Sequence, residues 1–432
     1  MLLSTPNKIL SRIILERIKD ALDAEFRPEQ AGFRKGKSCS DQIATLRIII
    51  EQSMEWQSNL YLNFIDFEKA FDSVDREVIW KLLKYYGVPQ IFINLIQQLY
   101  DNGTCQVIHN GKLSEAFGVN TGVRQGCLLS PMIFLIVVDW IMRQTVGNEK
   151  TGISWTDVKN LEDLDFADDL CLMSHKIEDL QAKTDKLVEE AAKTGLQVNI
   201  DKTEVMKITN QQQHQQHPAP ITINGRDLKE VTSFTYLGSI VSTTGGTDED
   251  VKSRIGKARN TFINLKPIWK SSSLNINNKI RIFNTNVKSV LLYGSETWRV
   301  TKNISNSLLH TFINNCLRSI LKIRWPERIT NKKLWEQTKQ EPIAQQICRR
   351  KWRWIGHSLR RPLGDIARQA LEWNPKGKRR VGRPRVTWRR SCEEELKQYG
   401  LTWMQVKITA EDRSKWRRAV EALCSTRNPR EQ

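Results

Sequence analysis

The chain has 432 residues, enough for roughly two to four structural units and a sizeable hydrophobic core. Hydrophobic residues make up 39 % of it, which excludes a disordered chain. The 67 lysines and arginines outnumber the 48 aspartates and glutamates, giving a net charge of +19. A charge of that size favours a polyanionic partner, with a merely soluble basic protein as the alternative.

Neither membrane insertion nor zinc binding is expected. The longest apolar run, residues 131–138, is shorter than the about 20 residues that a membrane-spanning helix needs. Acidic residues in the first 26 positions argue against a mitochondrial presequence. The eight cysteines lack the close spacing of zinc ribbons and indicate reduced thiols in an intracellular protein.

The first half of the chain alternates helical and strand patterns. A strand is predicted over 59–67, with Asp66 near its end, and two short strands over 164–173 flank a turn at Ala167-Asp168-Asp169. Residues 211–220, which contain His214 and His217, are predicted to form a polar surface loop. Apolar periodicity predicts helices over 8–26, 41–55, 74–87, 90–101, 130–143 and 177–194.

The second half is helical and increasingly basic. Strand signals fade after residue 238, and residues 248–340 are predicted to be mostly helical. Residues 341–432 contain 23 Lys and Arg against 10 Asp and Glu, a net charge of +13. Most of the excess charge therefore lies in the last fifth of the chain.

Two acidic motifs stand out because they follow apolar strands. Asp66 occurs in Phe-Ile-Asp-Phe, and Asp168-Asp169 occurs in Phe-Ala-Asp-Asp. Carboxylates beside a packed core are costly unless they are paired or bind a metal. Two magnesium ions about 3.5–4 Å apart could activate a hydroxyl group and stabilise a leaving phosphate. The alternative is two solvated turns rich in aspartate.

The order of these motifs resembles the palm of reverse transcriptases, in the variant found in non-LTR (LINE-like) retroelements. Asp66 is followed by Gly-Val-Arg-Gln-Gly-Cys-Leu-Leu-Ser-Pro at 122–131 and then by Phe-Ala-Asp-Asp at 166–169. Residues 30–36, Gln-Ala-Gly-Phe-Arg-Lys-Gly, resemble the fingers motif of that family, and residues 195–203 resemble its next palm motif. The resemblance extends over nearly all of the chain.

The resemblance implies an α+β right-hand polymerase with an antiparallel-sheet palm, a helical thumb and a basic, mostly helical C-terminal domain. Its implied divisions are partial fingers at 1–58, the palm with inserted fingers elements at 59–245, the thumb at 246–340 and a nucleic-acid-binding region at 341–432. The implied reaction is attack of a primer 3′-hydroxyl on the α-phosphate of a dNTP, templated by RNA.

The resemblance also assigns site residues. Asp66, Asp168 and Asp169 would be catalytic and, with the backbone carbonyl of Phe67, would hold two Mg²⁺ ions, for which Mn²⁺ could substitute. The residues implied to contact the nucleotide are Phe67, Phe71, Gln125, Gly126 and Lys202. Those implied to contact the template or primer are Arg34, Arg124, Phe166, Tyr236, Leu237 and Gly238.

Three of these assignments carry a specific expectation. Phe71 would exclude a 2′-hydroxyl and so select dNTPs, with simple core packing as the alternative. Lys202 would donate a proton to the leaving pyrophosphate, with a solvated lysine at a strand edge as the alternative. Phe166 stands where tyrosine is the commoner residue, a change expected to preserve catalysis.

In the C-terminal part, basic residues alternate with tryptophans over 349–357 and 378–390. This pattern suits phosphate contacts with stacking on bases, and Gly-Arg-Pro at 382–384 could enter a minor groove or serve as a nuclear address. The alternative is a small helical domain with tryptophans in its core and arginines in water. Nucleic-acid binding and a helical domain of this kind are compatible with each other.

Two rival functions remain at the level of the sequence. An RNA-dependent RNA polymerase shares the aspartates, but Phe71 argues against it. A catalytically silent or domesticated retroelement fragment would only bind RNA or DNA. The chain opens inside what resembles the fingers, so an upstream endonuclease domain is expected in the full element. The expected partners are an RNA template, a DNA primer or target, and dNTPs. Priming at a chromosomal target implies nuclear localisation, with a cytoplasmic ribonucleoprotein stage.

Overall fold

The computed structural model describes residues 4–101, 103–147, 149–209, 219–299 and 308–425. The predicted loop with His214 and His217 lies outside them. Among the helices of these ranges, none is both long and apolar enough to cross a bilayer. The chain divides into two compact units. The first comprises Met1–Gln42, Trp56–Leu237 and Asn374–Arg379, and the second Ile43–Glu55, Gly238–Trp373 and Arg380–Gln432.

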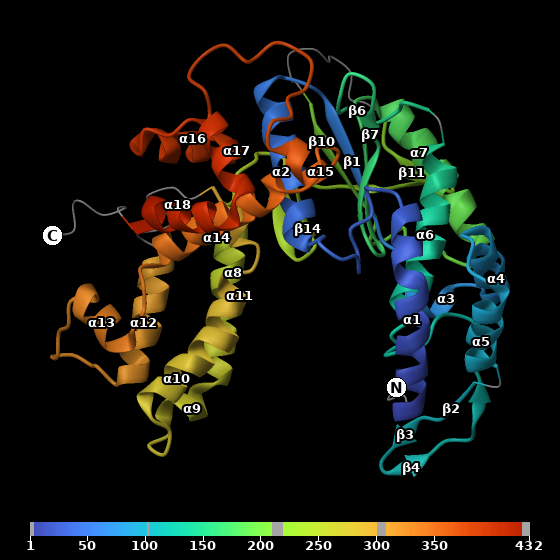
Figure 1. Ribbon diagram of the computed structural model, residues 1–432, viewed down its shortest axis with the longest axis horizontal. Coiled ribbons are helices and arrows are strands. Elements are labelled where there is room, and N and C mark those ends of the chain that lie inside the picture. The colour runs from blue at the N-terminus through green and yellow to red at the C-terminus, as the bar shows by residue number, and fades with distance from the viewer. Residues whose placement is uncertain (1–3, 102, 148, 210–218, 300–307, 426–432) are drawn as a thin grey trace. The chain divides into compact units, whose positions relative to one another are not determined.

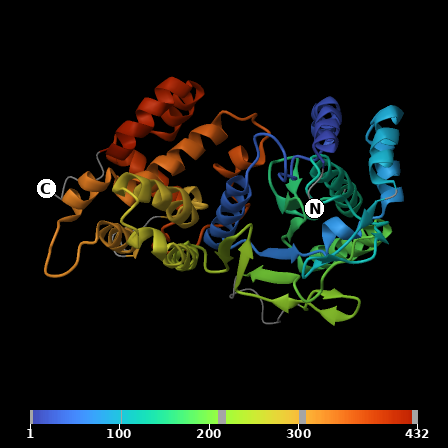
Figure 2. The ribbon, with the colours of Figure 1, turned by 90° about the horizontal axis from the view of Figure 1, so that it is seen from below.

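The first unit is built on a five-stranded sheet with the order β13-β10-β1-β9-β8 (Figure 1, Figure 2). Its central strand β1 runs antiparallel to both neighbours, and all six of its residues are buried. Strands β8 and β9 form the predicted hairpin around Ala167 and Asp168. The strand bounds are β1 Leu60–Ile65, β8 Asp163–Phe166, β9 Asp169–Ser174, β10 Glu204–Ile208 and β13 Lys229–Glu230.

The two faces of β1 have different neighbours, because successive side chains of a strand point to opposite faces. Tyr61 and Ile65 join the hydrophobic core formed with helices α6 (Ser130–Val146) and α7 (Ile177–Lys193). Phe64 points the other way and stacks on Phe234, with ring centroids 4.0 Å apart. Asp66, two residues after Phe64, therefore emerges on the face that the large helices do not cover.

The helices predicted for this unit are all present, with ends shifted by a few residues. A long hairpin follows α5, with its tip at β3 and β4, away from the sheet (Figure 1). The helices are α1 Thr5–Glu25, α3 Ala70–Ser73, α4 Arg76–Tyr85 and α5 Gln90–Tyr100, and α2 Cys39–Glu55 begins here while its residues 43–55 belong to the second unit. The remaining strands are β2 Thr104–Cys105, β3 Ile108–His109, β4 Lys112–Leu113, β5 Phe117–Gly118, β6 Ile153–Ser154, β7 Asn160–Leu161, β11 Thr222–Ile223, β12 Arg226–Asp227 and β14 Ser233–Tyr236.

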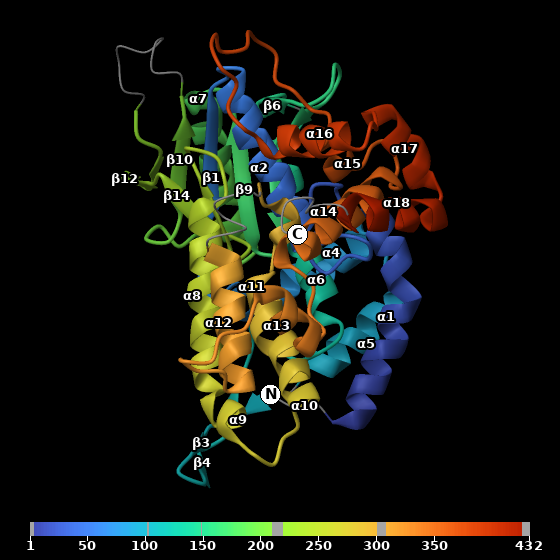
Figure 3. The same ribbon diagram turned by 90° about the vertical axis from the view of Figure 1, so that its left-hand side faces the viewer.

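The second unit is almost entirely helical, as the periodicity predicted for 248–340. Helix α8 packs against α11, and α12 packs against α9 and α10 (Figure 3). The unit also includes strand β15 Ser239–Ser242, a π-helical turn at Phe283–Lys288 and a 3₁₀ turn at Ser295–Thr297. Its helices are α8 Asp248–Asn264, α9 Lys266–Lys270, α10 Ile276–Ile282, α11 Ser289–Leu291, α12 His310–Leu321, α13 Asn331–Thr338, α14 Ile343–Leu359, α15 Ile366–Ala370, α16 Trp388–Gln398, α17 Trp403–Glu411 and α18 Arg413–Ser425.

A buried arginine joins distant parts of the second unit. Arg47 on α2 donates to Thr297 Oγ1 at 2.6 Å and to Ser239 Oγ at 3.0 Å. It also forms an ion pair at 3.0 Å with Asp250, which accepts a hydrogen bond from Trp298 Nε1. Burying these charges costs free energy unless each is paired, so the contacts fix α2 against α8 and β15. The sequence carries no signal for this pairing.

The C-terminal tryptophans are core residues. Trp352, Trp354, Trp388 and Trp416 are all buried, and they form the edge-to-face pairs Trp352–Trp416 and Trp354–Trp388. The prediction that tryptophans of 349–357 and 378–390 stack on bases is therefore wrong for Trp352, Trp354 and Trp388. The C-terminal helices of the second unit bury these large apolar side chains between them. All residues of the basic segment 376–386 are exposed.

Two helical glycines, Gly356 and Gly256, should respond oppositely to alanine. A Cβ at Gly356 in α14 would lie 1.9 Å from Trp416 Nε1, whereas a Cβ at Gly256 in α8 meets nothing within 4 Å. We expect Gly356→Ala to lower the free energy of unfolding by about 1–3 kcal/mol through overpacking. Gly256→Ala should raise it by up to about 1 kcal/mol because alanine favours helix. Urea unfolding measures both changes, and shifts of the same sign would contradict the packing described.

Candidate active site

The register of the sheet brings Asp66 between Lys202 and Asp169. Ile65 pairs with Leu170 on β9, so the next residue, Asp66, lies opposite Asp169. Phe64 pairs with Glu204 on β10, so two residues further along Asp66 lies opposite Lys202. Directly opposed residues of antiparallel strands project their side chains from the same face. Residues more than a hundred positions apart therefore meet at one end of the sheet.

The backbone around Asp66 is held on both sides. Its N–H donates to Thr203 Oγ1 at 3.3 Å, and its carbonyl accepts from Asn199 N–H at 2.8 Å. Lys202 Nζ lies 3.7 Å from Asp66 Oδ2 and its side chain is exposed. Lys202 lies in a turn before β10, and not at a strand edge as the alternative interpretation predicted. Its ammonium group also pairs with Asp66, a predicted catalytic aspartate, which that alternative did not include.

The other two aspartates belong to the β8–β9 hairpin. Ala167 and Asp168 form its turn, with Ala167 at φ +57°, and Asp169 is the first residue of β9. Partial burial raises the pKa of the Asp168 carboxyl, and the nearby charge of Asp66 raises it further. Partial burial and the charges of Asp168 and Asp66 raise the pKa of Asp169 to about 6. The three carboxyl groups thus repel one another, and a bound cation would relieve that repulsion.

The residues fit a magnesium site whose remaining ligands come from a substrate. Asp66 Oδ2 is shielded from solvent and accepts no hydrogen bond from any described residue. Within the described ranges, no three acidic, cysteine or histidine side chains lie close enough to hold an ion by themselves. Magnesium usually takes one or two carboxylates together with phosphates and water. Carboxylate oxygens at the end of a strand, one of them shielded from solvent and without a hydrogen bond, are consistent with that mode of binding.

Phe71 is fixed by aromatic contacts beside the aspartates. Its ring stacks on Phe134 of α6 at 4.2 Å, and Phe33 meets it edge-on at 6.4 Å. The side chain is half-buried, so it packs into the core and still presents an edge to solvent. Core packing and nucleotide contact are therefore compatible for Phe71.

The loop before α6 packs tightly on the α3 turn. A Cβ at Gly122 would lie 2.5 Å from the carbonyl oxygen of Asp72, so only glycine allows this approach. Gln125 is exposed and its Nε2 lies 3.4 Å from Asp72 Oδ1. Gly126 is exposed with φ +85°. The structure thus brings the predicted nucleotide residues Gln125 and Gly126 near the segment that carries Phe71.

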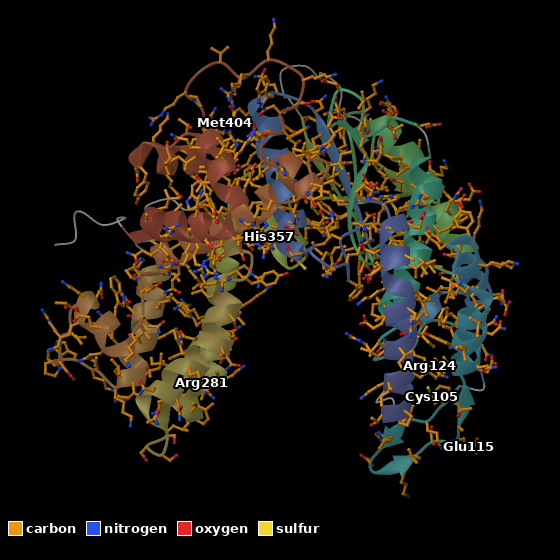
Figure 4. All side chains as sticks on the ribbon, viewed as in Figure 1. Cys105, Glu115, Arg124, Arg281, His357 and Met404 are labelled. Carbon is orange, nitrogen blue, oxygen red and sulfur yellow. The ribbon has the colours of Figure 1, made fainter. Side chains whose placement is uncertain are left out.

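Arg124 is directed toward α5. Its guanidinium lies 5.3 Å from the centre of the Tyr100 ring, and its backbone N–H donates to the Tyr100 hydroxyl at 3.3 Å. Figure 4 labels Arg124 near the start of the hairpin that carries Cys105. Of the remaining predicted residues, Phe67 is buried and Phe166 is half-buried.

Arg34 supports a loop and does not present its charge to solvent. Its guanidinium donates to the Asp23 carboxylate at 2.6 Å and to the carbonyls of Asp23, Arg27 and Gln30 at 2.8, 2.6 and 3.1 Å. The side chain is only 9 % exposed. Residues 27–37 lack regular structure, so their carbonyls need other donors. This geometry opposes the prediction of a direct template contact by Arg34.

Tyr236 is likewise a packing residue. It is buried, its ring lies 5.9 Å from that of Phe64, and its hydroxyl donates to the Leu164 carbonyl at 3.1 Å. Leu237 and Gly238 follow with φ +47° and +76°, and Gly238 is exposed. The buried Tyr236 side chain is therefore not exposed for the predicted primer contact, and the contacts predicted for Leu237 and Gly238 stay predictions.

The sequence analysis missed a buried charge network behind the hairpin. Arg27 forms ion pairs with Asp163 and Asp165, both fully buried on β8. Burial and the adjacent Asp163 raise the pKa of Asp165 well above its usual range. The only hint is the Asp-Leu-Asp alternation, which places both carboxylates on one face of a strand. Nothing in the sequence identified Arg27 as their partner.

The sheet hairpin with two aspartates at its tip, beside a third on the adjacent central strand, defines a right-hand polymerase palm. The family model "Reverse transcriptase (RNA-dependent DNA polymerase)" matches residues 1–241, more than half of the chain. The chain belongs to this family. A second model, for a domain of unknown function, matches residues 261–293.

Curated relatives are polyproteins of retroelements, which confirms the resemblance to non-LTR reverse transcriptases. The Pol polyprotein of the type-2 retrotransposable element R2DM of Drosophila melanogaster is 31 % identical over 205 residues, 47 % of this chain and 19 % of that protein. The R2 Pol polyprotein of Popillia japonica is 26 % identical over 56 % of this chain and 39 % of its own length. The probable RNA-directed DNA polymerase from transposon BS of Drosophila melanogaster is 22 % identical over 87 % of this chain and 41 % of its own.

The chain therefore spans less than half the length of these relatives. Among solved structures, telomerase from Candida tropicalis in complex with a telomeric RNA fragment is 14 % identical, with a TM-score of 0.42. That match covers 84 % of this chain and 56 % of the telomerase chain. A likeness at this level supports no inference about function.

Arg34→Met tests whether Arg34 supports the loop or binds the template. We expect the free energy of unfolding to fall by about 1.5–3 kcal/mol, because a buried charge-assisted hydrogen-bond network is lost. Under conditions where both proteins are folded, Kd for a template–primer duplex should stay within about twofold. Lys35→Met, at the exposed neighbouring position, is the control for stability. A large rise in Kd with unchanged stability would restore the predicted template contact.

Proposed function

We propose that this chain is an RNA-directed DNA polymerase that extends a primer 3′-hydroxyl with dNTPs on an RNA template. The observation that carries the proposal is the convergence of Asp66, Asp168 and Asp169 at one end of the sheet, set by the strand register. Membership of the reverse transcriptase family supports the same reaction. Such domains use divalent metal ions, and the oxygen donors here favour magnesium.

Asp66, Asp168, Asp169 and the Phe67 carbonyl would hold two Mg²⁺ ions, or Mn²⁺ in their place. Bound ions of this kind neutralise phosphate charge and lower the pKa of an attacking hydroxyl. The chain's own contribution is to fix the carboxylates through the β1, β9 and hairpin backbones. Positioning and charge stabilisation of this kind supply most of the catalysis in phosphoryl transfer.

Two residues next to the carboxylates would act on the nucleotide. Phe71, immobilised between Phe134 and Phe33, would stack under the sugar and leave no room for a 2′-hydroxyl. Lys202 would contact the triphosphate and donate its ammonium proton to the departing pyrophosphate. Its exposed ammonium group, 3.7 Å from Asp66 Oδ2, can reach a ligand held by that carboxylate. Gln125 and Gly126 would line the same nucleotide site.

The partners follow from the reaction. We propose an RNA template and a DNA primer or target, with an upstream endonuclease domain in the full element and action in the nucleus by target-primed reverse transcription. The boundaries at 58, 245 and 340 between fingers, palm, thumb and basic region remain part of this proposal. The exposed residues 376–386 suit phosphate contacts, because Lys376, Lys378 and Arg383 form no ion pair with any described residue.

Primer extension on an RNA template with dNTPs and Mg²⁺ tests the activity. We expect the Asp168→Asn/Asp169→Asn double variant to lose at least about 100- to 1,000-fold in rate, because neutral amides replace the two carboxylates that would bind the metal ions. Asp227→Asn, at an exposed acid on β12, should extend like wild type. If wild type and double variant bind template–primer equally and neither extends it, the chain is a silent nucleic-acid-binding fragment.

Sugar selection is tested separately by Phe71→Val. Removing the ring should admit a 2′-hydroxyl, so the ratio of rNTP to dNTP incorporation should rise about tenfold or more. Single-nucleotide incorporation gives kcat/KM for each substrate. Phe33→Val, which removes the neighbouring exposed ring, is the matched control for lost aromatic packing. An unchanged ratio would leave Phe71 as a core residue only.

A further inference from the structure

The side chain of Gln30 is bonded to the backbone of the turn that carries Asp168. Gln30 Oε1 accepts from Ala167 N–H at 2.7 Å and from Gly32 N–H at 2.8 Å. Its Nε2 donates to the Ala167 carbonyl at 3.3 Å. One amide group thus satisfies both backbone polar groups of Ala167. Gln30 is 1 % exposed, so solvent does not compete for these bonds.

The segment around Gln30 also pairs with β8, directly before the turn. Ala31 N–H donates to the Asp165 carbonyl at 2.9 Å, and Asp165 N–H donates to the Glu29 carbonyl at 3.3 Å. Gln42 Nε2 donates to both of these carbonyls at 2.8 Å. Residues 29–31 therefore lie along β8 as a short parallel addition to the sheet.

The turn needs this support because of its conformation. Ala167 has φ +57°, a left-handed backbone that is unfavourable for alanine unless its surroundings hold it. Gly32 packs so closely that a Cβ there would lie 2.3 Å from Ala167 N. Asp168 is the next residue, so a shift of the Ala167 peptide moves its carboxylate.

We propose that Gln30 is a positioning residue for the polymerase reaction: its amide clamps the Ala167 peptide and thereby fixes Asp168 and Asp169 for metal and nucleotide. Gly32 has a second role: because it lacks a Cβ, the segment that carries Gln30 can lie close to the Ala167 peptide. The inference rests on the proposed polymerase function and deepens it, because it links the fingers segment to the geometry of the carboxylates. Gln30 touches no substrate and acts only through the backbone of the turn.

Gln30→Met tests the clamp, because methionine has a similar shape and makes none of the three bonds. Asn63→Leu is the matched control: Asn63 is a fully buried amide on β1, bonded to Thr184 on the face opposite Asp66. Single-turnover extension from a preformed template–primer complex, normalised by active-site titration, counts only folded and bound enzyme. We expect Gln30→Met to lose about 10- to 100-fold in this rate with Kd for template–primer unchanged, and Asn63→Leu to retain it.

A second readout does not depend on catalysis. Mn²⁺ binding followed by electron paramagnetic resonance should weaken several-fold in Gln30→Met and not in Asn63→Leu, since looser carboxylates hold an ion less well. If Gln30→Met does not fold, Gly32→Ala displaces the same peptide from another atom and should give the same two changes. If Gln30→Met has the same normalised rate and Mn²⁺ affinity as Asn63→Leu, the role of Gln30 is overturned and the proposed function is not. A wild type that binds template–primer without extending it would overturn the proposed function and the inference together.

Discussion

Three carboxylates do not gather by their own preference, because like charges repel one another. In this protein the antiparallel register of β1 with β9 and β10 brings them together. That register is strongly specified, since a slip of one residue would turn Tyr61 and Ile65 away from the core and bury Asp66 in their place. The hydrophobic effect acting on β1 therefore determines which residues Asp66 faces, and the geometry of the site follows from packing.

Near that sheet, buried polar side chains form hydrogen bonds with the backbone of loops and turns. Gln30 satisfies the Ala167 peptide, and Arg34 donates to one carbonyl at the end of α1 and to two carbonyls of the loop that follows it. Arg47 plays the comparable part in the second unit, where it reaches Ser239, Thr297 and Asp250. A buried donor left without a partner costs free energy, so each of these side chains restricts its loop to few conformations. Residues of the fingers motif thus act largely as scaffold.

In the C-terminal region, several tryptophans are buried and the basic segment 376–386 is exposed. Trp352, Trp354, Trp388 and Trp416 supply buried apolar area between the C-terminal helices, while the basic residues of 376–386 are exposed to solvent. The alternation of tryptophan and arginine along the chain is consistent with both roles, because it does not show which side chains face inward. Charge in this region is available for phosphates, and the buried aromatic rings are not available for bases.

The sequence by itself determined the helices between residues 8 and 194, the mostly helical character of 248–340, the strand before Asp66 and the hairpin around Asp168, because apolar periodicity and turn residues are local signals. It also indicated the aspartates and their family, since the motifs keep a fixed order along the chain. Only the tertiary structure decided that Lys202 meets Asp66, that Arg34 and Tyr236 point inward, and that Gln30 clamps the turn. These contacts join residues up to 137 positions apart, and a hydrogen bond between such partners depends on register and burial, which no local pattern of residues encodes.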